Sequence, residues 1–250
     1  MKNYCCLICG GPSLLIDVVD FNKNCEEARG LYLPLMGHGV YYVRCSVCNY
    51  TYAPEFGSWS SQDFLGMIYN NDYQEVDPDY LTARPEKNAE ALNRIFCENL
   101  NEIVHLDYGG GNGKLSDLLR HSNWNSRSYD PFPDDVPMDF NAGTFNLITV
   151  FEVFEHVPNP LSMMDNIVKA LNPENGLVLF STLASDGFIN EHERLTWWYV
   201  APRNGHIGIH SLKSLRILGE RFGLEFRSLS PGVHAYFKIL PDWAKNIFTK

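Results

Sequence analysis

The chain has 250 residues, of which 45% are hydrophobic and 20% are charged. This balance is typical of one large globular domain, alone or with a small accessory module, and it argues against a disordered or fibrous chain. The formal net charge of -10 and the lack of lysine and arginine clusters disfavour nucleic acid and membranes as partners. The sequence also lacks the apolar run of a membrane span and the apolar core of a signal peptide. We therefore expect a cytoplasmic protein whose seven cysteines are reduced thiols or metal ligands rather than disulfides.

Two pairs of cysteines near the N-terminus have the spacing of metal ligands. Cys6 and Cys9 form one C-x2-C unit, and Cys45 and Cys48 form another. Two intervening residues let one tight turn direct both sulfurs at the same ion, and four thiolates suit the tetrahedral geometry of structural Zn²⁺. We therefore predict a structural zinc site with these four ligands. Cys5 in place of Cys6 is one alternative, and four buried or stray thiols are the other.

The next segment, residues 56–101, is rich in helical and aromatic patterns. We expect one helix from Ser58 to Tyr69 and a second that begins near Pro85, since proline suits the first turn of a helix. The stretch between them is dense in turn residues and tyrosine. It is either a cap over a pocket or a surface linker.

From residue 102 onward, apolar strands alternate with amphipathic helices, which predicts a Rossmann-like α/β domain with a mostly parallel sheet. A hairpin turned at residues 230–232 would add an antiparallel strand at the end. We expect the earlier strands at residues 103–106, 127–129, 145–151 and 177–180. The predicted parts are a zinc-ribbon-like module at 1–55, a helical linker or cap at 56–101, and the α/β domain at 102–250.

A glycine-rich motif joins the first of these strands to a helix. It reads His105-Leu106-Asp107-Tyr108-Gly109-Gly110-Gly111-Asn112-Gly113-Lys114. At such a turn, glycines let a nucleotide-type ligand lie against bare backbone. Lys114 stands where a dinucleotide fingerprint has its last glycine, and no Ser or Thr follows it as in a phosphate-binding loop, so NAD and ATP are both disfavoured. Asp107 would repel a pyrophosphate and favours a cationic ligand such as an ammonium or a sulfonium.

A second acid, Asp130, follows the next predicted strand. A carboxylate at this place can accept hydrogen bonds from both hydroxyls of a ribose. Phe132, two residues further on, can pack against an adenine ring. The alternative is that Asp130 and Pro131 only begin a turn.

Two later runs complete the pattern: residues 143–148, Gly-Thr-Phe-Asn-Leu-Ile, and residues 151–160, which fit E-V-x-E-H-V-x-x-P. Together with the two acidic motifs, they resemble the class I S-adenosylmethionine-dependent methyltransferases over about residues 102–240. The resemblance implies a seven-stranded sheet whose last strand is antiparallel. It also implies that the loop of Asp107 holds the methionine part of the cofactor and that Asp130 holds the ribose. The cofactor-binding residues predicted on this basis are Asp107, Tyr108, Gly109, Gly111, Gly113, Asp130, Phe132, Phe151 and Glu152.

The sequence departs from this family between its second acid and the next strand. Residues 131–144 are too few for the helix and the strand that the family has there. We expect either a remodelled pocket rim or a sheet with one strand fewer. Asp139 is the one candidate for the family's adenine-contacting acid.

Two histidines are candidates for a general base that removes the proton of an acceptor hydroxyl. His156 follows the strand end at which ligands bind, and His206 lies in an aromatic loop with glycines. The alternatives are that His156 caps its loop and that His206 is an ordinary surface histidine. Arg203 would either clamp an acceptor phosphate or carboxylate or remain a solvated surface group.

The sequence thus predicts an S-adenosylmethionine-dependent methyltransferase with a small-molecule or carbohydrate-like acceptor. The four-cysteine module is similar to that of some bacterial sugar methyltransferases, including C-methyltransferases. Those enzymes have a further large C-terminal domain, whereas this sequence ends at Lys250, which counts against sugar C-methylation. We expect O-methylation rather than C- or N-methylation. The alternatives are a catalytically silent scaffold that binds a protein partner, an RNA or protein methyltransferase, and a nicotinamide enzyme. The sequence does not indicate an oligomeric state.

Overall fold

The computed structural model describes residues 4–132 and 140–248. The chain forms two compact units, each assembled from three separate segments. Unit 1 comprises Met1–Pro78, Phe154–Leu161 and Thr182–Leu218. Unit 2 comprises Asp79–Val153, Ser162–Ser181 and Gly219–Lys250. Both units are therefore discontinuous in sequence, and the division at residues 55 and 101 stays a prediction.

Unit 1 contains a five-stranded antiparallel sheet in the order β1-β2-β3-β4-β9. Its strands are β1 (Tyr4–Cys5), β2 (Pro12–Asp20), β3 (Gly39–Cys45), β4 (Thr51–Tyr52) and β9 (Gly208–Ile209). The short strand β9 pairs Ile209 with Thr51, although more than 150 residues separate them. The N-terminal strands are therefore completed by a late segment of the chain.

The helices of unit 1 are short. They are η1 (Cys25–Arg29), η2 (Pro54–Ser58), α1 (Ser61–Met67), α2 (Tyr73–Val76) and η4 (Pro202–Asn204). The single helix expected from Ser58 to Tyr69 is wrong at its start, because Ser60 caps α1 in a capping box with Asp63. The ring of Trp59, just before this cap, packs 4.5 Å from that of Phe56 and 5.3 Å from that of Phe64.

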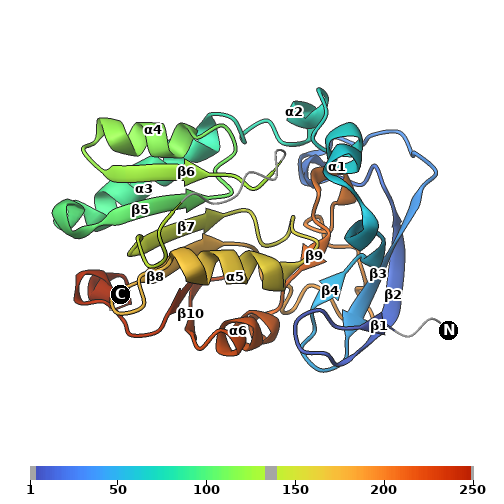
Figure 1. Ribbon diagram of the computed structural model, residues 1–250. Helices are drawn as coiled ribbons and strands as arrows, with labels where there is room; N and C mark the ends of the chain where they lie inside the picture. Colours follow the sequence, from blue (N-terminus) through green and yellow to red (C-terminus); the bar gives the residue numbers. More distant parts are fainter. Residues whose placement is uncertain (1–3, 133–139, 249–250) are drawn as a thin grey trace. The chain divides into compact units, whose positions relative to one another are not determined.

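Unit 2 is built on a six-stranded sheet in the order β10-β11-β8-β7-β5-β6 (Figure 1). The strands are β5 (Val104–Tyr108), β6 (Asn125–Tyr129), β7 (Leu147–Phe151), β8 (Leu177–Ser181), β10 (Glu225–Ser230) and β11 (Val233–Phe237). The pairs β5–β6, β5–β7 and β7–β8 are parallel, whereas β11 runs antiparallel to both of its neighbours. This confirms the predicted mostly parallel sheet with an antiparallel last strand.

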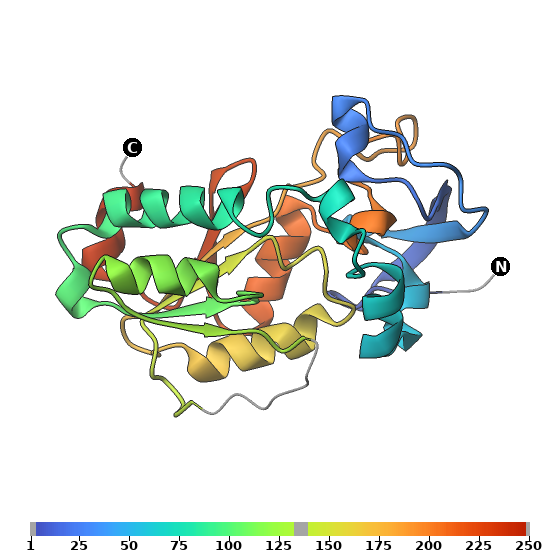
Figure 2. The ribbon, with the colours of Figure 1, turned by 90° about the horizontal axis from the view of Figure 1, so that it is seen from above.

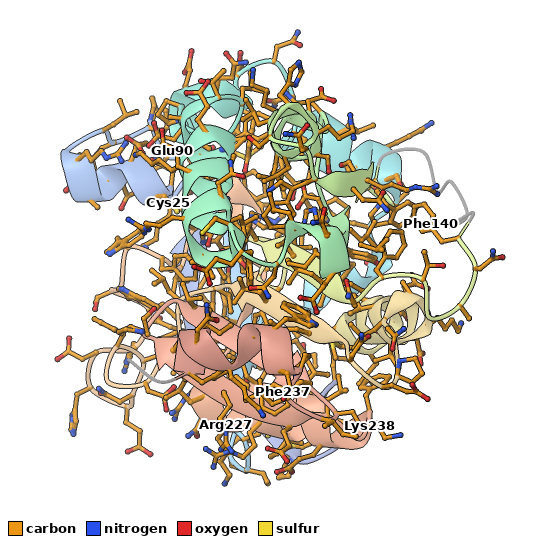
Figure 3. All side chains as sticks on the ribbon, turned by 90° about the vertical axis from the view of Figure 1, so that its left-hand side faces the viewer. Cys25, Glu90, Phe140, Arg227, Phe237 and Lys238 are labelled. Atoms are coloured by element: carbon orange, nitrogen blue, oxygen red, sulfur yellow. The ribbon has the colours of Figure 1, made fainter. Side chains whose placement is uncertain are left out.

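The seventh strand implied by the family resemblance is absent from the described part of unit 2. The described residues between β6 and β7 contain neither a helix nor a named strand, as the short connection predicts. Asp139, the candidate adenine-contacting acid, lies outside the described residues. Phe140, labelled in Figure 3, packs with its ring 5.0 Å from that of Phe145 and 6.0 Å from that of Tyr129.

Helices cover both faces of the unit 2 sheet, with α3 on one face and α5 on the other (Figure 1 and Figure 2). The core beside α3 and α4 combines the buried stripe of α3 with Leu119, Leu147 and Trp243. Ala89, Leu92 and Phe96 are the buried residues of α3 and form one apolar stripe, which explains why this segment forms a helix against the sheet. The helices of unit 2 are α3 (Ala83–Phe96), η3 (Leu100–Glu102), α4 (Lys114–His121) and η5 (Asp242–Phe248). Two more helices, α5 (Pro160–Ala170) and α6 (Leu212–Arg221), begin in segments of unit 1 and end in segments of unit 2. None of the helices in the described ranges combines the length and the apolar character that crossing a membrane requires.

A pocket with a volume of about 520 Å³ lies beside the C-terminal hairpin of unit 2. Arg227, Phe237 and Lys238 line it and are labelled in Figure 3. It contains none of the residues that the sequence predicts for a site.

Candidate functional site

The predicted cofactor loop lies at the C-terminal end of β5 in unit 2. β5 ends at Tyr108, and α4 begins directly after Gly113. The φ angles of Gly109, Gly111 and Gly113 are 76°, 54° and 77°, a region that side chains other than glycine rarely adopt. A Cβ at Gly109 would also lie 3.1 Å from Cγ1 of Val153. The backbone itself therefore requires the three glycines assigned to cofactor binding.

Gly110 belongs to the same loop but is not among the residues that the sequence predicts for cofactor binding. A Cβ at this position would lie 2.6 Å from Oδ2 of Asp107 and would overlap Oγ of Ser128. Glycine here leaves room for the carboxylate of Asp107. The motif contains the signal, an acid three residues before a glycine, but only the three-dimensional structure shows that the two residues meet.

Asp107 is almost completely buried, and its carboxylate is held by a hydrogen bond. Oγ1 of Thr149 donates to Oδ1 of Asp107 at 2.9 Å. Burial raises the pKa of Asp107 to about 7, the hydrogen bond from Thr149 opposes this shift, and the nearby charge of Asp130 adds to it. Above that pH, Asp107 is a buried negative charge, which a cationic ligand would stabilise.

The hydrogen-bonded chain continues from Thr149 into the sheet. His105 lies with Nε2 at 2.9 Å from Oγ1 of Thr149 and with Nδ1 at 2.8 Å from Oγ of Ser126. Burial lowers the pKa of His105 to about 3, so the imidazole is neutral near pH 7. His105 is therefore a structural residue, and its contact with Oγ1 of Thr149 helps to position the hydroxyl that donates to Asp107.

Asp130 links the glycine loop to the segment after β6. Its Oδ2 accepts a hydrogen bond from the amide of Gly111 at 2.7 Å, and its Oδ1 accepts one from the amide of Phe132 at 2.9 Å. Burial raises the pKa of Asp130, while these two backbone hydrogen bonds oppose the shift. A carboxylate has further lone pairs beyond these two hydrogen bonds, so the turn and a ribose contact are compatible.

The end of β7 contributes the remaining predicted cofactor residues, Phe151 and Glu152. Glu152 has a φ of 53°, an uncommon value for a residue other than glycine. Oγ of Ser181 donates to its Oε1 at 2.6 Å, and its amide donates to Ser181 as well. Since β5, β6 and β7 are adjacent and parallel, their C-terminal ends lie at one edge of the sheet, where ligands bind in such folds.

The four predicted zinc ligands converge in unit 1. All four sulfurs lie within 4.8 Å of one another, with 3.5 Å between Cys6 and Cys48 and 3.4 Å between Cys9 and Cys45. Zinc–thiolate bonds of about 2.3 Å in a tetrahedron place the sulfurs about 3.8 Å apart, so the cluster fits Zn²⁺. Cys5 is exposed and outside this cluster, as the choice of Cys6 predicts.

The thiols of Cys6 and Cys48 are also hydrogen-bonded to each other. A hydrogen bond from the Cys48 thiol lowers the pKa of Cys6 to about 5, and the pKa of Cys48 is raised accordingly. The amides of Val47 and Cys48 donate to Sγ of Cys45 at 3.3 and 3.4 Å. Such donors stabilise a thiolate, which is the form that binds metal.

A second cluster in unit 1 brings together Glu155 and both candidate histidines. One ligand-type atom from each of Glu155, His156 and His206 lies within 4.8 Å of the others. The centroids of the two imidazole rings are 4.9 Å apart, and the ring planes make an angle of 77°. Glu155 is completely buried and His206 is 6% exposed, so the reading of His206 as a surface histidine is wrong.

Two tyrosines surround this cluster. The hydroxyl of Tyr199 donates to Oε1 of Glu155, and the carbonyl of Tyr199 accepts from Nδ1 of His206 at 2.7 Å. The hydroxyl of Tyr69 lies 3.2 Å from Nδ1 of His156. Neither Glu155 nor Tyr199 is among the residues that the sequence predicts for a site.

The loop before His206 is held by buried polar residues. Arg203 is 6% exposed and donates to the carbonyl of Ile68 at 2.8 Å and to Oδ1 of Asn70 at 3.0 Å. Asn204 accepts from the amide of Cys25 at 2.8 Å. Arg203 is therefore not a solvated surface group; these bonds fix the position of the loop.

Comparison with known proteins agrees with this geometry. Residues 80–229 match the model of a family described as methyltransferase domain, and the chain belongs to this family. The methyltransferase expected from the glycine loop and the two acids is thereby confirmed at the level of the family.

Curated relatives match parts of the chain. The chain is 26% identical over 138 residues to the mitochondrial ubiquinone biosynthesis O-methyltransferase of Saccharomyces cerevisiae, covering 46% of this chain and 44% of that protein. A stretch of 43 residues is 46% identical to the ubiquinone biosynthesis O-methyltransferase of Vibrio campbellii, covering 17% and 18% of the two chains. The chain thus spans less than half the length of these relatives.

Solved structures of similar proteins include a putative O-methyltransferase from Nostoc punctiforme, with 13% identity, a TM-score of 0.46, and coverage of 67% of this chain and 59% of that chain. The plantazolicin methyltransferase BpumL, solved with S-adenosylhomocysteine (SAH) and a pentazolic desmethylPZN analogue, has 11% identity and a TM-score of 0.46, covering 67% and 91% of the two chains.

Proposed function

We propose that this protein transfers a methyl group from S-adenosylmethionine to an oxygen of a small-molecule or carbohydrate-like acceptor. The observation that carries the proposal is the pair of acids, Asp107 and Asp130, around a glycine loop at the C-terminal edge of the sheet in a member of the methyltransferase-domain family. The yeast relative, an O-methyltransferase by name, supports oxygen as the acceptor atom.

The cofactor would lie along the glycine loop. When bound, S-adenosylmethionine supplies an activated methyl group, so the protein mainly has to bind and align it. Asp107 would bind the cationic methionine part, and Asp130 the ribose hydroxyls. The remaining contacts in this proposal come from the backbone of Gly109, Gly111 and Gly113 and from the side chains of Tyr108, Phe132, Phe151 and Glu152.

The proton of an acceptor hydroxyl would pass to His156 or His206. The carbonyl of Tyr199 can only accept, so Nδ1 of His206 bears a proton, and Nε2 is the ring atom that can take another. This tautomer supports His206 as a general base. His156 has a hydroxyl partner, Tyr69, which can donate or accept, so its tautomer is open.

We further propose that Cys6, Cys9, Cys45 and Cys48 hold one structural Zn²⁺. Four thiolates leave no open coordination position, so this metal would stabilise unit 1 and would not take part in the reaction. A cytoplasmic location is part of the proposal, and it rests on the cysteines: in the described ranges, which include all seven, no disulfide joins them.

Calorimetric titration of the full chain with SAH tests the cofactor site. We expect micromolar binding, no binding of NADH, and affinities reduced about tenfold or more in Asp107→Ala and Asp130→Ala, because each loses a charged hydrogen-bond partner. Asp117→Ala, which changes an exposed acid on α4, should bind normally. Wild-type affinity in both site variants would contradict the assignment.

Labelled S-adenosylmethionine with a panel of phenols, hydroxy acids and sugars then tests the acceptor. Transfer to oxygen that is lost in His206→Ala supports the proposal. Binding of SAH with no turnover on any acceptor would favour the scaffold alternative. A salt-dependent interaction with oligonucleotides would favour the RNA methyltransferase instead.

A further inference from the structure

Glu155, His156 and His206 form a second set of potential metal ligands, separate from the four cysteines. Each residue offers one ligand-type atom, and these atoms lie within 4.8 Å of one another. The ligands of one transition-metal ion lie about 3–4 Å from each other, so only small side-chain movements would close the site. We propose that this cluster binds a divalent transition-metal ion, with Zn²⁺ as the first candidate.

The hydrogen bonds around the cluster have the pattern of outer groups that orient metal ligands. A ligating histidine usually donates its other ring N–H to a carbonyl or a carboxylate, which fixes its tautomer. Nδ1 of His206 donates in this way to the carbonyl of Tyr199 at 2.7 Å, and the hydroxyl of the same tyrosine donates to Oε1 of Glu155. We therefore assign Nε2 of His206 and Oε2 of Glu155 as ligand atoms. The Tyr69 hydroxyl lies 3.2 Å from Nδ1 of His156, so we assign Nε2 as the ligand atom of that residue.

The backbone holds the two ligand-bearing segments together. The amides of Ile207 and Gly208 donate to the carbonyl of Glu155 at 2.9 and 3.0 Å. The segment of Glu155 and His156 is thus tied to that of His206 by main-chain hydrogen bonds as well as by side chains. A site preorganised in this way binds a cation without a large loss of conformational entropy.

The charge of the cluster also suits a cation. Glu155 is completely buried, and the hydrogen bond from Tyr199 offsets only part of the cost of removing a carboxylate from water. A divalent ion between Glu155 and two neutral imidazoles would neutralise that charge. The ligand set is the one found in zinc enzymes and in non-haem iron sites that retain open positions.

The open positions distinguish this cluster from the four cysteines. Three protein ligands leave room for water or for another oxygen ligand, whose pKa the ion would lower. With the ion bound, Nε2 of His156 and His206 would be ligands and not bases. The general-base role proposed above would then apply to the metal-free protein, while the binding of the ion does not depend on methyl transfer.

Cobalt titration of the metal-free full chain separates the two sites. Co²⁺ at the cysteines gives intense thiolate-to-metal charge-transfer absorption, whereas Co²⁺ at Glu155, His156 and His206 gives weak visible bands only. We expect two equivalents per chain, with charge transfer accompanying one of them. A single equivalent that brings the thiolate charge transfer would overturn the proposal.

Variants assign the second equivalent to its ligands. We expect His206→Ala and Glu155→Gln to lose it and to keep the thiolate bands, and Cys45→Ser to lose the thiolate bands and keep the second equivalent. The control His192→Ala, at an exposed histidine of the same unit, should bind both. Retention of the second equivalent in both site variants would refute the proposal.

Tyr199→Phe is a milder variant that removes only the hydrogen bond to Glu155. This variant should bind the second Co²⁺ ion about 10- to 100-fold more weakly, without losing it altogether. Titration of each variant with SAH keeps the two proposals apart, because the residues assigned to the cofactor belong to unit 2. Loss of the second cation with normal SAH binding would leave the proposed cofactor site intact.

Discussion

Asp107 is the central residue of the proposed cofactor site. Its carboxylate is buried with one hydrogen bond from Thr149, and burial raises its pKa to about 7. The folded protein therefore carries a group whose charge changes near neutral pH, at the place where we expect the cationic end of the cofactor. Two consequences follow, one for binding and one for stability.

The affinity for SAH should fall as the pH decreases through about 7. Protonation of Asp107 removes the negative charge that attracts the ligand's ammonium group, so one pH unit below 7 we expect roughly tenfold weaker binding than at alkaline pH. Calorimetry across this range measures the effect. An affinity that is the same on both sides of pH 7 would contradict it.

Two variants identify Asp107 as the titrating group. Asp107→Asn should bind weakly and without this pH dependence. Thr149→Val removes the hydrogen bond that lowers the pKa of Asp107, so the midpoint should move to higher pH. A midpoint that stays in place in Thr149→Val would mean that another group titrates.

The same carboxylate should destabilise the ligand-free protein at alkaline pH. Its folded pKa, about 7, lies above the ordinary 3.8, so its unfavourable contribution begins above pH 3.8 and is complete above pH 7. Asp107→Asn should therefore raise the free energy of unfolding above pH 7, by about 4 kcal/mol at most. Urea unfolding on both sides of this range measures the difference, and a less stable variant above pH 7 would contradict the expectation.

At the scale of elements, the two clusters of unit 1 differ in how far the sequence reveals them. The C-x2-C pairs are local, since each is one turn beside β1 or β3, and both could be predicted from spacing alone. The neighbourhood of Glu155 and Tyr199 could not, because it depends on a hydrogen bond between residues 44 positions apart. Likewise, Asp107 and the glycines follow from one strand–turn–helix motif, whereas the contact of Gly110 with Asp107 needs the folded loop.

The fold, too, has features that short segments of sequence predict and one feature that they do not. The alternation of strands and helices predicts the parallel sheet and its last hairpin, since both depend on patterns within short segments. The length of the segment after Asp130 predicts either a remodelled pocket rim or a missing strand, and the described part of unit 2 lacks the seventh strand. The pairing of β4 with β9 could not be predicted, because two-residue strands have no periodicity of their own.

The cysteine cluster should hold one zinc ion per chain and should stabilise unit 1. We expect Cys45→Ser to lose one equivalent of zinc and to unfold more easily by several kcal/mol, because structural zinc binding contributes directly to folding. Elemental analysis and thermal unfolding measure these changes. Cys97→Ser, at an exposed cysteine outside the cluster, is the matched control, and a metal-free wild-type protein with a normal fold would refute the assignment.

At the scale of the whole molecule, the two units divide the proposed tasks. Every residue assigned to the cofactor belongs to unit 2, whereas both potential metal clusters belong to unit 1. Each unit has its own sheet, so the loss of a ligand in one need not abolish binding in the other.

Cofactor binding should therefore be insensitive to the zinc site. We expect Cys45→Ser to bind SAH with an affinity within about threefold of the wild type, a difference of less than 1 kcal/mol. Calorimetry at a temperature where the variant is still folded makes the comparison. A loss of tenfold or more would show that the two units are coupled.

The strand β9 also has a consequence for how the chain folds while the ribosome is still synthesising it. Residues 208–209 complete a sheet whose other strands end at residue 52, so the ribosome must add about 150 residues before the edge of β4 is covered. Until then, the nascent N-terminus exposes an open β-edge, which is prone to wrong pairing and to capture by chaperones. A fragment that ends at Tyr52 would leave this edge of β4 open permanently.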